Sequence, residues 1–178
     1  MTEEPEEIRW AGKFITARTR GKWEYVTRAR GIRAAVILAI DAEDHVILVE
    51  QFRVPLQKRC LELPAGLIGD DDGAEGEDAL AAAVRELEEE TGYHADRIEN
   101  LGEFYSSPGM VSESFTLVRA HGLARVGPGG GTDGEDITVH RVAFAHLPQF
   151  VEMARARGLG IDVRVLMLLA PALLGGTK

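Results

Sequence analysis

Apolar residues along this chain recur at two spacings, one typical of a helix and the other typical of strands. Between Asp78 and Thr91, apolar side chains stand at positions 80, 83, 84 and 87, which is the spacing of a buried helix face. Asp78 is placed to cap the start of that helix, and Gly92 is placed to end it. Two further helices are expected towards the carboxyl end, near residues 147–157 and 162–174.

Patterns typical of strands occur in several segments along the chain. Residues 8–30 alternate polar with bulky side chains around a turn near Gly21, which predicts a short antiparallel sheet. Residues 34–40 and 45–52 are two apolar runs separated by a polar turn, so they are predicted to form a hairpin buried within a sheet. Further strands are expected at 61–63, 98–105, 115–120 and 137–144, with a glycine-rich loop at 127–134. This mixture predicts an α+β or layered α/β/α fold rather than a doubly wound parallel sheet.

Composition limits the size of the protein and its partners. The chain has 178 residues, of which 45% are hydrophobic and 28% charged, which is typical of one compact domain with a small appendage. We therefore divide it into an N-terminal β subdomain, residues 1–30, and a main domain, residues 31–178. The net charge of −9 repels nucleic acid and anionic membranes, so neither is an expected partner. A phosphate-bearing substrate would need a local positive site.

Three features favour a cytoplasmic protein. Cys60 is the only cysteine, so no internal disulfide can form, and the residue is expected to be a small buried hydrophobe. The first seven residues are acidic and lack the pattern of a signal peptide. The most apolar stretch, residues 163–174, contains Arg164 and Pro171 and is shorter than the roughly 20 residues that span a bilayer. We expect it to be a packed helix.

Glutamates crowd the end of the predicted helix at 78–91. Glu86, Glu89 and Glu90 share one helix face, and each like-charge pair at this spacing costs about 0.2–0.5 kcal/mol. The negative end of the helix dipole repels them further. A solvated acidic face is one interpretation. The adjacent Leu87 belongs to the buried stripe, which favours a site for a divalent cation with oxygen ligands, either Mg²⁺ or Mn²⁺.

This segment resembles the signature of the Nudix hydrolase family, which ends in Arg-Glu-apolar-x-Glu-Glu-x-Gly-apolar, as residues 85–93 do. The resemblance implies an α/β/α sandwich with a mixed sheet and a small N-terminal antiparallel subdomain. It implies that Glu86, Glu89, Glu90 and the carbonyl of Ala65 bind the metal, that Glu86 is catalytic, and that Arg85 orients a neighbouring glutamate. Glu77 corresponds to the upstream glutamate of the signature, and residues 69–76 contain an insertion relative to the family.

The resemblance is strongest to the ADP-ribose/ADP-sugar pyrophosphatase branch. It implies that Glu135 is the general base on a mobile loop, with Asp133 and Asp136 as neighbouring alternatives. Phosphate contact is implied for Arg53, whose planar fork suits it. The remaining substrate-binding residues implied by this branch are Glu62, Pro108, Gly109, Met110 and Glu113.

The two tryptophans align with the adenine-stacking residues of the same branch. Trp10 and Trp23 offer large flat faces, and Arg28 follows the second of them. In this branch the two rings come from different subunits of an exchanged dimer, so the resemblance implies a homodimer in which residues 8–30 cross the interface. The alternative is that both rings anchor the N-terminal sheet.

The function implied is metal-dependent hydrolysis of ADP-ribose or a related ADP-sugar to AMP and a sugar phosphate. Nothing in the sequence names the base or the sugar, so hydrolysis of another nucleotide sugar such as GDP-mannose remains an alternative. A second alternative is a sensor that binds a nucleotide sugar without cutting it. The presence of all three glutamates favours catalysis.

Overall fold

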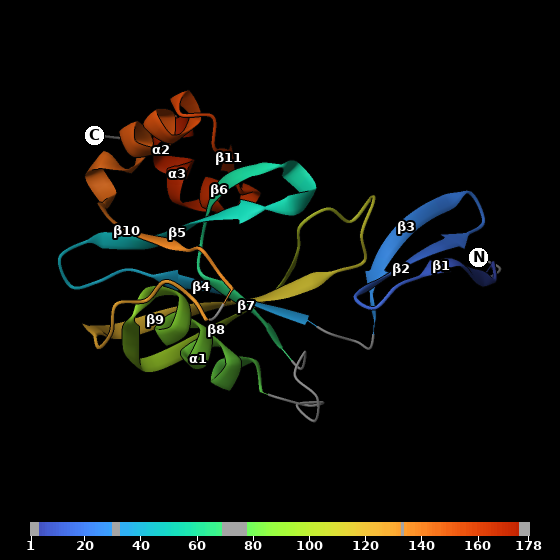
Figure 1. Ribbon diagram of the computed structural model, residues 1–178, viewed down its shortest axis with the longest axis horizontal. Helices are drawn as coiled ribbons and strands as arrows, with labels where there is room; N and C mark the ends of the chain where they lie inside the picture. The colour runs from blue at the N-terminus through green and yellow to red at the C-terminus, as the bar shows by residue number, and fades with distance from the viewer. Residues whose placement is uncertain (1–3, 30–32, 69–77, 133, 175–178) are drawn as a thin grey trace.

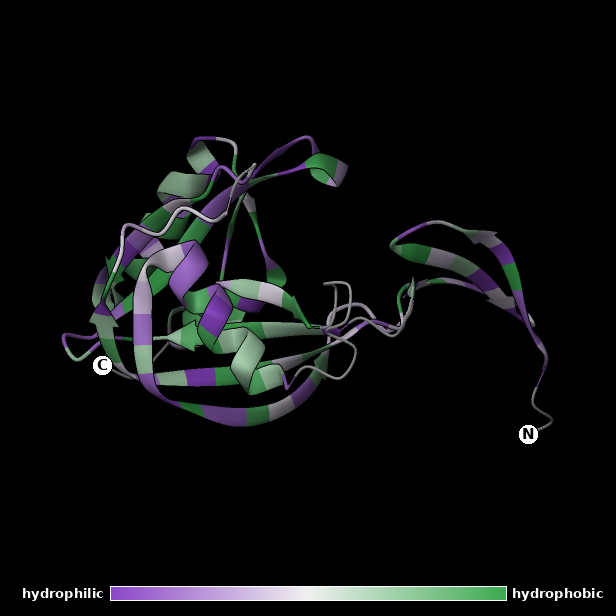
Figure 2. Ribbon diagram, turned by 60° about the horizontal axis from the view of Figure 1, so that its bottom comes forward, coloured by the Kyte–Doolittle hydropathy of each residue, from purple (hydrophilic) through white to green (hydrophobic). Residues whose placement is uncertain are grey.

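The computed structural model describes residues 4–29, 33–68, 78–132 and 134–174. Two four-stranded sheets form the centre of the main body, with one helix on one side and two on the other (Figure 1). A separate three-stranded sheet extends from this body at the N-terminal end (Figures 1 and 2). The predicted α+β sandwich with an N-terminal antiparallel sheet is confirmed.

The N-terminal sheet is a simple antiparallel meander. It contains β1 (Glu6–Ala11), β2 (Ile15–Arg20) and β3 (Trp23–Arg28) in that order. The turn between β2 and β3 includes Gly21 at a φ of 58°, a conformation that glycine adopts readily. Among the described residues of this sheet, Thr16 has the one buried side chain. The sheet therefore has almost no core within a single chain.

Both central sheets are mixed. The first contains β7 (Ala65–Ile68), β4 (Arg33–Ala39), β9 (Ser114–Arg125) and β8 (Tyr93–Tyr105), with β4 and β9 parallel. The second contains β10 (Thr138–Ala143), β5 (His45–Arg53), β6 (Lys58–Glu62) and β11 (Gly160–Ile161), with β6 and β11 parallel. The remaining strand neighbours are antiparallel.

Three α-helices cover the central sheets. They are α1 (Ala79–Thr91), α2 (Leu147–Ala156) and α3 (Leu166–Leu173), and the short 3-10 helices are η2 (Val54–Leu56), η3 (Phe144–His146) and η4 (Val163–Val165). The expected start and end of α1 are correct: Asp78 stands at its N-cap, although its side chain makes no capping hydrogen bond, and Gly92 ends it in a left-handed conformation.

The hydrophobic core has two parts, one on each side of the sheets. Leu87 and the small residues of α1 pack with Ala35 and Ile37 of β4. On the other side, Val151 of α2 and Leu168 of α3 pack with residues of β5, β6 and β9. Within the C-terminal stretch that was expected to be a packed helix, Val165, Leu168 and Leu169 are buried in this second part of the core. None of the described helices has the length and apolar character needed to span a membrane.

The predicted hairpin of residues 34–40 and 45–52 is wrong. Both segments are buried strands, but β4 pairs with β7 and β9, whereas β5 pairs with β10 and β6. Both edges of each strand are therefore occupied by other partners. The two strands pair with each other only beside their connecting turn, where Ile40 forms an isolated bridge with Val46. Continuous apolar runs identify strands buried on both faces but do not identify their neighbours.

Candidate active site

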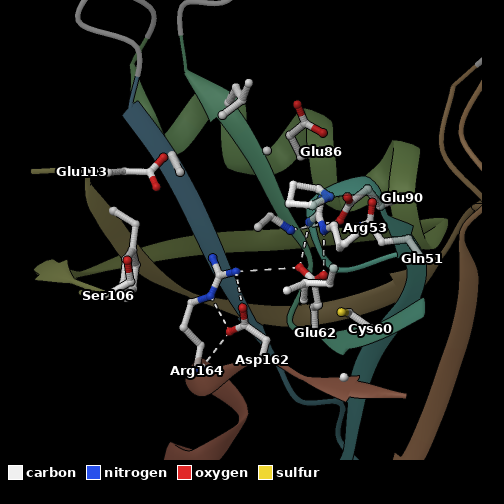
Figure 3. Close-up of a pocket in the computed structure, with 18 of the residues that line it drawn as sticks. Gln51, Arg53, Cys60, Glu62, Glu86, Glu90, Ser106, Glu113, Asp162 and Arg164 are labelled. Atoms are coloured by element: carbon white, nitrogen blue, oxygen red, sulfur yellow. Dashed lines mark hydrogen bonds and ion pairs between the residues drawn. The ribbon is translucent and has the colours of Figure 1, made fainter. Parts of the chain in front are cut away.

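A cavity of about 630 Å³ lies where the two central sheets meet α1 and the segment around β11. Residues of β5, β6 and β7 form one part of its wall, and Glu86 and Glu90 of α1 form another (Figure 3). The opposite side is lined by Gly160, Ile161, Asp162 and Arg164. The cavity therefore collects side chains that are far apart in the sequence.

Arg53 and Glu62, both singled out in the sequence, form a bidentate ion pair on this wall. Arg53 donates from Nε to Glu62 Oε1 and from Nη2 to Oε2, at 2.7 Å in each case. Glu62 is only 3% exposed. Hydrogen bonding to the Glu62 carboxylate raises the pKa of Arg53, so the guanidinium remains charged and has a fixed orientation within the cavity.

A second pair, Asp162 and Arg164, was not predicted. Arg164 donates from Nε to Asp162 Oδ1 at 2.6 Å and from Nη2 to Oδ2 at 2.8 Å. Its Nη2 also lies 3.7 Å from Glu62 Oε2, and its guanidinium carbon lies 5.6 Å from the ring centroid of Phe115. Burial alone would lower the pKa of Arg164, but the Asp162 carboxylate raises it overall. Acids and bases thus alternate from Asp162 through Arg164 and Glu62 to Arg53.

Helix α1 places two of the three glutamates predicted to bind a metal in the cavity, which Ala65, the fourth predicted ligand, also lines. Glu90 is 4% exposed, and its Oε2 accepts a hydrogen bond from the backbone N–H of Ala65 at 3.0 Å. Burial, reinforced by the charges of Glu86 and Glu135, raises the pKa of Glu90 to about 8. Burial likewise raises the pKa of Glu86. The metal-free site therefore opposes ionisation of these carboxyl groups.

The third predicted ligand, Glu89, is not among the described residues that line the cavity. Its Oε2 lies 3.2 Å from Nη1 of Arg85, which also lies 2.9 Å from Oε1 of Glu86. Arg85 therefore contacts two of the predicted ligands, as an orienting residue would. Within the described residues, no three histidine, cysteine or acidic side chains converge as a ready-made metal site.

The donor set fits a hard divalent cation. Glu86 and Glu90 offer carboxylate oxygens on one helix face, where a cation would offset their mutual repulsion. Glu86 also lies directly over Gly66: a Cβ at that glycine would be 1.9 Å from Glu86 Cγ and 2.3 Å from Oε1. Gly66 thus leaves a space between the backbone of β7 and α1 that a carboxylate group occupies.

Glu135 reaches the same cavity from the loop between β9 and β10. Its Oε2 accepts hydrogen bonds from Thr132, from the backbone N–H at 2.8 Å and from Oγ1 at 3.2 Å. The alternative Asp136 instead pairs with Arg59, outside the cavity lining. Asp133, Glu77 and the insertion at residues 69–76 lie outside the described residues.

The N-terminal candidates are divided between two places. Arg28 and Glu113 both line the cavity and form an ion pair, Nε to Oε1 at 2.6 Å. Trp23 instead lines a second hollow together with Pro108 and Gly109.

Trp10 and Met110 are 56% and 61% exposed, and neither lines the 630 Å³ cavity. The same is true of Trp23, which is 64% exposed. Within one chain, the structure therefore does not bring the two tryptophans to the glutamates of α1.

The charge of the cavity wall is negative overall. Its described lining carries six carboxyl groups, of Glu62, Glu86, Glu90, Glu113, Glu135 and Asp162, against three guanidinium groups, of Arg28, Arg53 and Arg164. A diphosphate entering such a site needs additional positive charge. A divalent cation would supply that charge.

Comparison with known proteins identifies the architecture. The family model described as NUDIX domain matches residues 30–156, which include α1 and all three of its candidate glutamates. The chain belongs to the Nudix hydrolase family. Over 98% of its length the Nudix chain superposes on 94% of a solved structure described as "Crystal structure of ADP compounds hydrolase", with a TM-score of 0.70 and 25% identity.

Among curated relatives, the chain is 40% identical to a methanol dehydrogenase activator of Bacillus methanolicus, over 58% of this chain and 53% of the relative. It is 42% identical to an ADP-ribose pyrophosphatase of Bacillus subtilis, over 51% of this chain and 46% of that one. A GDP-mannose pyrophosphatase of Salmonella arizonae is 33% identical over 88% of this chain and 78% of the relative. The chain thus spans about half the length of the first two proteins.

Proposed function

We propose that this Nudix protein hydrolyses the diphosphate of ADP-ribose or a related ADP-sugar, releasing AMP and a sugar phosphate. One observation carries the proposal: Arg53, Glu86, Glu90 and Glu135 line a single cavity, although they come from three separate parts of the chain. Similarity to an ADP-ribose pyrophosphatase and to the solved ADP compounds hydrolase supports the choice of substrate.

Glu86, Glu89 and Glu90, with the carbonyl of Ala65, would hold Mg²⁺ or Mn²⁺. The cation would offset the charge of the diphosphate and lower the pKa of the attacking water. For Glu89 to join the other two, its carboxylate has to leave Arg85. Arg85 would then orient the carboxylate of Glu86, which is both a metal ligand and a catalytic residue.

The chain's other groups divide the remaining tasks. Arg53, oriented by Glu62, binds a phosphate oxygen through its guanidinium. Glu135 accepts the proton of the attacking water, for which its carboxylate leaves Thr132. No side-chain nucleophile is required, and the thiol of Cys60 on the cavity wall stays protonated because burial raises its pKa.

The N-terminal sheet supports a homodimer. Its exposed apolar side chains include Ile8, Trp10, Phe14 and Trp23, each more than half exposed. A three-stranded sheet with so little core of its own is stabilised when a second surface covers these side chains. In the exchanged dimer, residues 8–30 reach the partner subunit, and Trp10 and Trp23 stack on the adenine together with Pro108, Gly109 and Met110. A reducing cytoplasm is consistent with the one free, buried cysteine.

Hydrolysis of GDP-mannose is the second candidate. It is supported by the similarity to a GDP-mannose pyrophosphatase over 88% of the chain. The metal site and Arg53 would serve both substrates alike, because they contact the shared diphosphate. The two candidates differ at the base and the sugar.

The test is hydrolysis of ADP-ribose, ADP-glucose and GDP-mannose with Mg²⁺ or Mn²⁺, followed by chromatography of the products. Glu90→Gln is the inactivating variant. Glu88→Gln is the matched control, because Glu88 lies on the same helix but pairs with His94 outside the cavity lining.

We expect AMP from ADP-ribose, a loss of about 10²-fold or more in kcat for Glu90→Gln, and little change for Glu88→Gln. If GMP is released from GDP-mannose faster than AMP is released from ADP-ribose, the preferred base is guanine rather than adenine. The proposed metal mechanism would still stand. Tight binding of a nucleotide sugar without any turnover would make the protein a sensor.

A further inference from the structure

Hydrogen bonds to other elements of the fold hold the loop that carries Glu135 on both sides of that residue. It connects β9, which ends at Arg125, to β10, which begins at Thr138. The first part of the loop is bonded to α1, and the last part is bonded to an arginine of β6. Glu135 stands between these two anchors.

The first anchor joins the loop to the C-terminal turn of α1. The backbone N–H groups of Gly130 and Gly131 donate to the carbonyls of Glu90 and Glu89, at 2.9 and 3.0 Å. These carbonyls belong to the last helical turn, whose acceptors have no partner within the helix. The loop is therefore attached to the same helix that presents the candidate metal ligands.

The second anchor is Arg59 of β6. Its Nη1 donates to Asp136 Oδ2 at 2.7 Å, and its Nη2 lies 3.2 Å from the Asp136 carbonyl and 3.3 Å from Thr138 Oγ1. Its Nε donates to Glu50 Oε1 at 2.9 Å, and Nη2 also donates to the Glu50 carbonyl. One guanidinium thus joins β6, β5 and the residue that directly follows Glu135.

The buried carboxylate of Glu50 holds the Arg59 guanidinium in place. Glu50 is 7% exposed and also accepts hydrogen bonds from His140 and Arg157, at 3.0 and 3.3 Å. Burial alone would raise the pKa of Glu50, but the hydrogen bonds from His140 and Arg59 lower it overall. The carboxylate therefore stays ionised and holds the guanidinium in place.

Arg59 does not line the cavity. Side chains alternate between the two faces of a strand, so Arg59 lies on the opposite face of β6 from Cys60 and Glu62, which do line it. Arg59 consequently reaches the cavity only through the loop that it holds. The guanidinium is neither a substrate ligand nor a proton acceptor there.

We propose that Arg59 is a positioning residue, which fixes the end of the loop so that the Glu135 carboxylate stays at the diphosphate site. The proposal rests on the proposed function, since it takes Glu135 as the base. A displacement of about 1 Å in a catalytic group costs on the order of 10²-fold in rate. Loss of the five hydrogen bonds from Arg59 to Glu50, Asp136 and Thr138 is enough to allow such a displacement.

The test replaces Arg59 by methionine, which keeps an apolar stem but lacks the guanidinium group. Glu50 then retains His140 and Arg157, so its charge is not left unpaired. Arg157→Met is the matched control, because Arg157 also bonds Glu50 but has no hydrogen bond or ion pair with the described residues of the loop. Arg59→Lys, which keeps the charge but cannot make all five bonds, is the conservative variant.

We expect kcat of Arg59→Met to fall about 10- to 100-fold with KM within about twofold. Arg59→Lys should lose less, and Arg157→Met should match the wild type. In the double variant Arg59→Met/Glu135→Gln, kcat should equal that of Glu135→Gln, because Arg59 acts through that side chain. An unchanged kcat in Arg59→Met, or losses that multiply in the double variant, would overturn the proposal.

Hydrogen exchange tests the anchor independently of turnover. The amides of Glu135 and Ile137 are bonded to the carbonyls of Thr132 and Gly130, and they should exchange faster in Arg59→Met but not in Arg157→Met. Equal exchange in all three proteins would refute the anchor. Absence of hydrolysis in the wild type, with faster exchange in Arg59→Met, would instead refute the proposed reaction while leaving the anchor established.

Discussion

Glutamine in place of Glu90 is expected to make the metal-free protein more stable, although it removes a proposed metal ligand. The pKa of Glu90 rises from an ordinary 4.5 to about 8 in the folded state, chiefly because the side chain is buried. Between these two values the folded protein holds a proton that the unfolded chain has released. The free energy of unfolding of the wild type therefore falls as the pH rises from about 4.5 to 8. Glutamine does not titrate, and its Oε1 can still accept the N–H of Ala65.

The size of the effect follows from the pKa shift. Each unit corresponds to about 1.4 kcal/mol, so the advantage of Glu90→Gln is close to zero at pH 4 and on the order of 3 kcal/mol at pH 7. Above pH 8 it reaches a limit of about 5 kcal/mol. For a domain of this size, 3 kcal/mol corresponds to a rise of about 6–12 °C in Tm.

The assay is thermal and urea unfolding from pH 5 to 9, first in EDTA and then in Mg²⁺. In EDTA the gap between Glu90→Gln and wild type should widen with pH, whereas Glu88→Gln should follow the wild type. Mg²⁺ should raise the Tm of the wild type more than that of Glu90→Gln, because it binds the ionised carboxylate. A gap that stays constant across this pH range would refute the argument that burial opposes the charge of Glu90.

Three further substitutions test other parts of the site. In Gly66→Ala, the new Cβ would lie 2.0 Å from Glu86 Cδ, so we expect Mg²⁺ affinity, measured by titrating turnover, to fall at least about tenfold while the circular dichroism spectrum is unchanged. Arg164→Met should lower the free energy of urea unfolding by about 2–3 kcal/mol, because it leaves the Asp162 carboxylate without its bidentate partner; adding Asp162→Asn should restore most of that loss. Gly129→Ala should lower stability by at least about 1–2 kcal/mol in thermal unfolding, because φ is 68° and the added Cβ would lie 2.4 Å from the backbone carbon of Thr91. Gly109→Ala is its control, since no atom lies within 4 Å of a Cβ built there.

The sequence predicted helix α1 correctly because a helix depends on residues that are close together in the chain. Helix α1 follows from its apolar spacing and from Gly92, and its glutamates could be assigned to one face before any tertiary contact was known. Strand pairing depends on partners distant in the chain. Residues 34–40 and 45–52 were therefore identified as buried strands but paired incorrectly. The first pairs with the distant strands β7 and β9, and the second pairs with β6, which follows it directly, and with the distant β10.

Some residues of the candidate site could likewise be predicted from the sequence, whereas others could not. Glu86, Glu90 and Arg53 stand in recognisable motifs and meet in the cavity. Arg164 reaches it only because β11 pairs with β6 beside Cys60, a contact between residues about 100 positions apart. Arg59 gains its role from the register that sets Phe52 opposite it and places Glu50 within reach. No periodicity in the sequence carries that information.

The two-part core has a consequence for how proteins of this kind diversify. The glutamates of α1 rest on one hydrophobic cluster, around Leu87, whereas Asp162 and Arg164 precede residues of the other cluster, such as Val165 and Leu168. Mutations in the C-terminal segment can reshape the far wall of the cavity while the packing beneath α1 stays intact. The shape of that wall can thus change without a change in the packing that supports Glu86 and Glu90, and the two parts of the cavity can evolve at different rates.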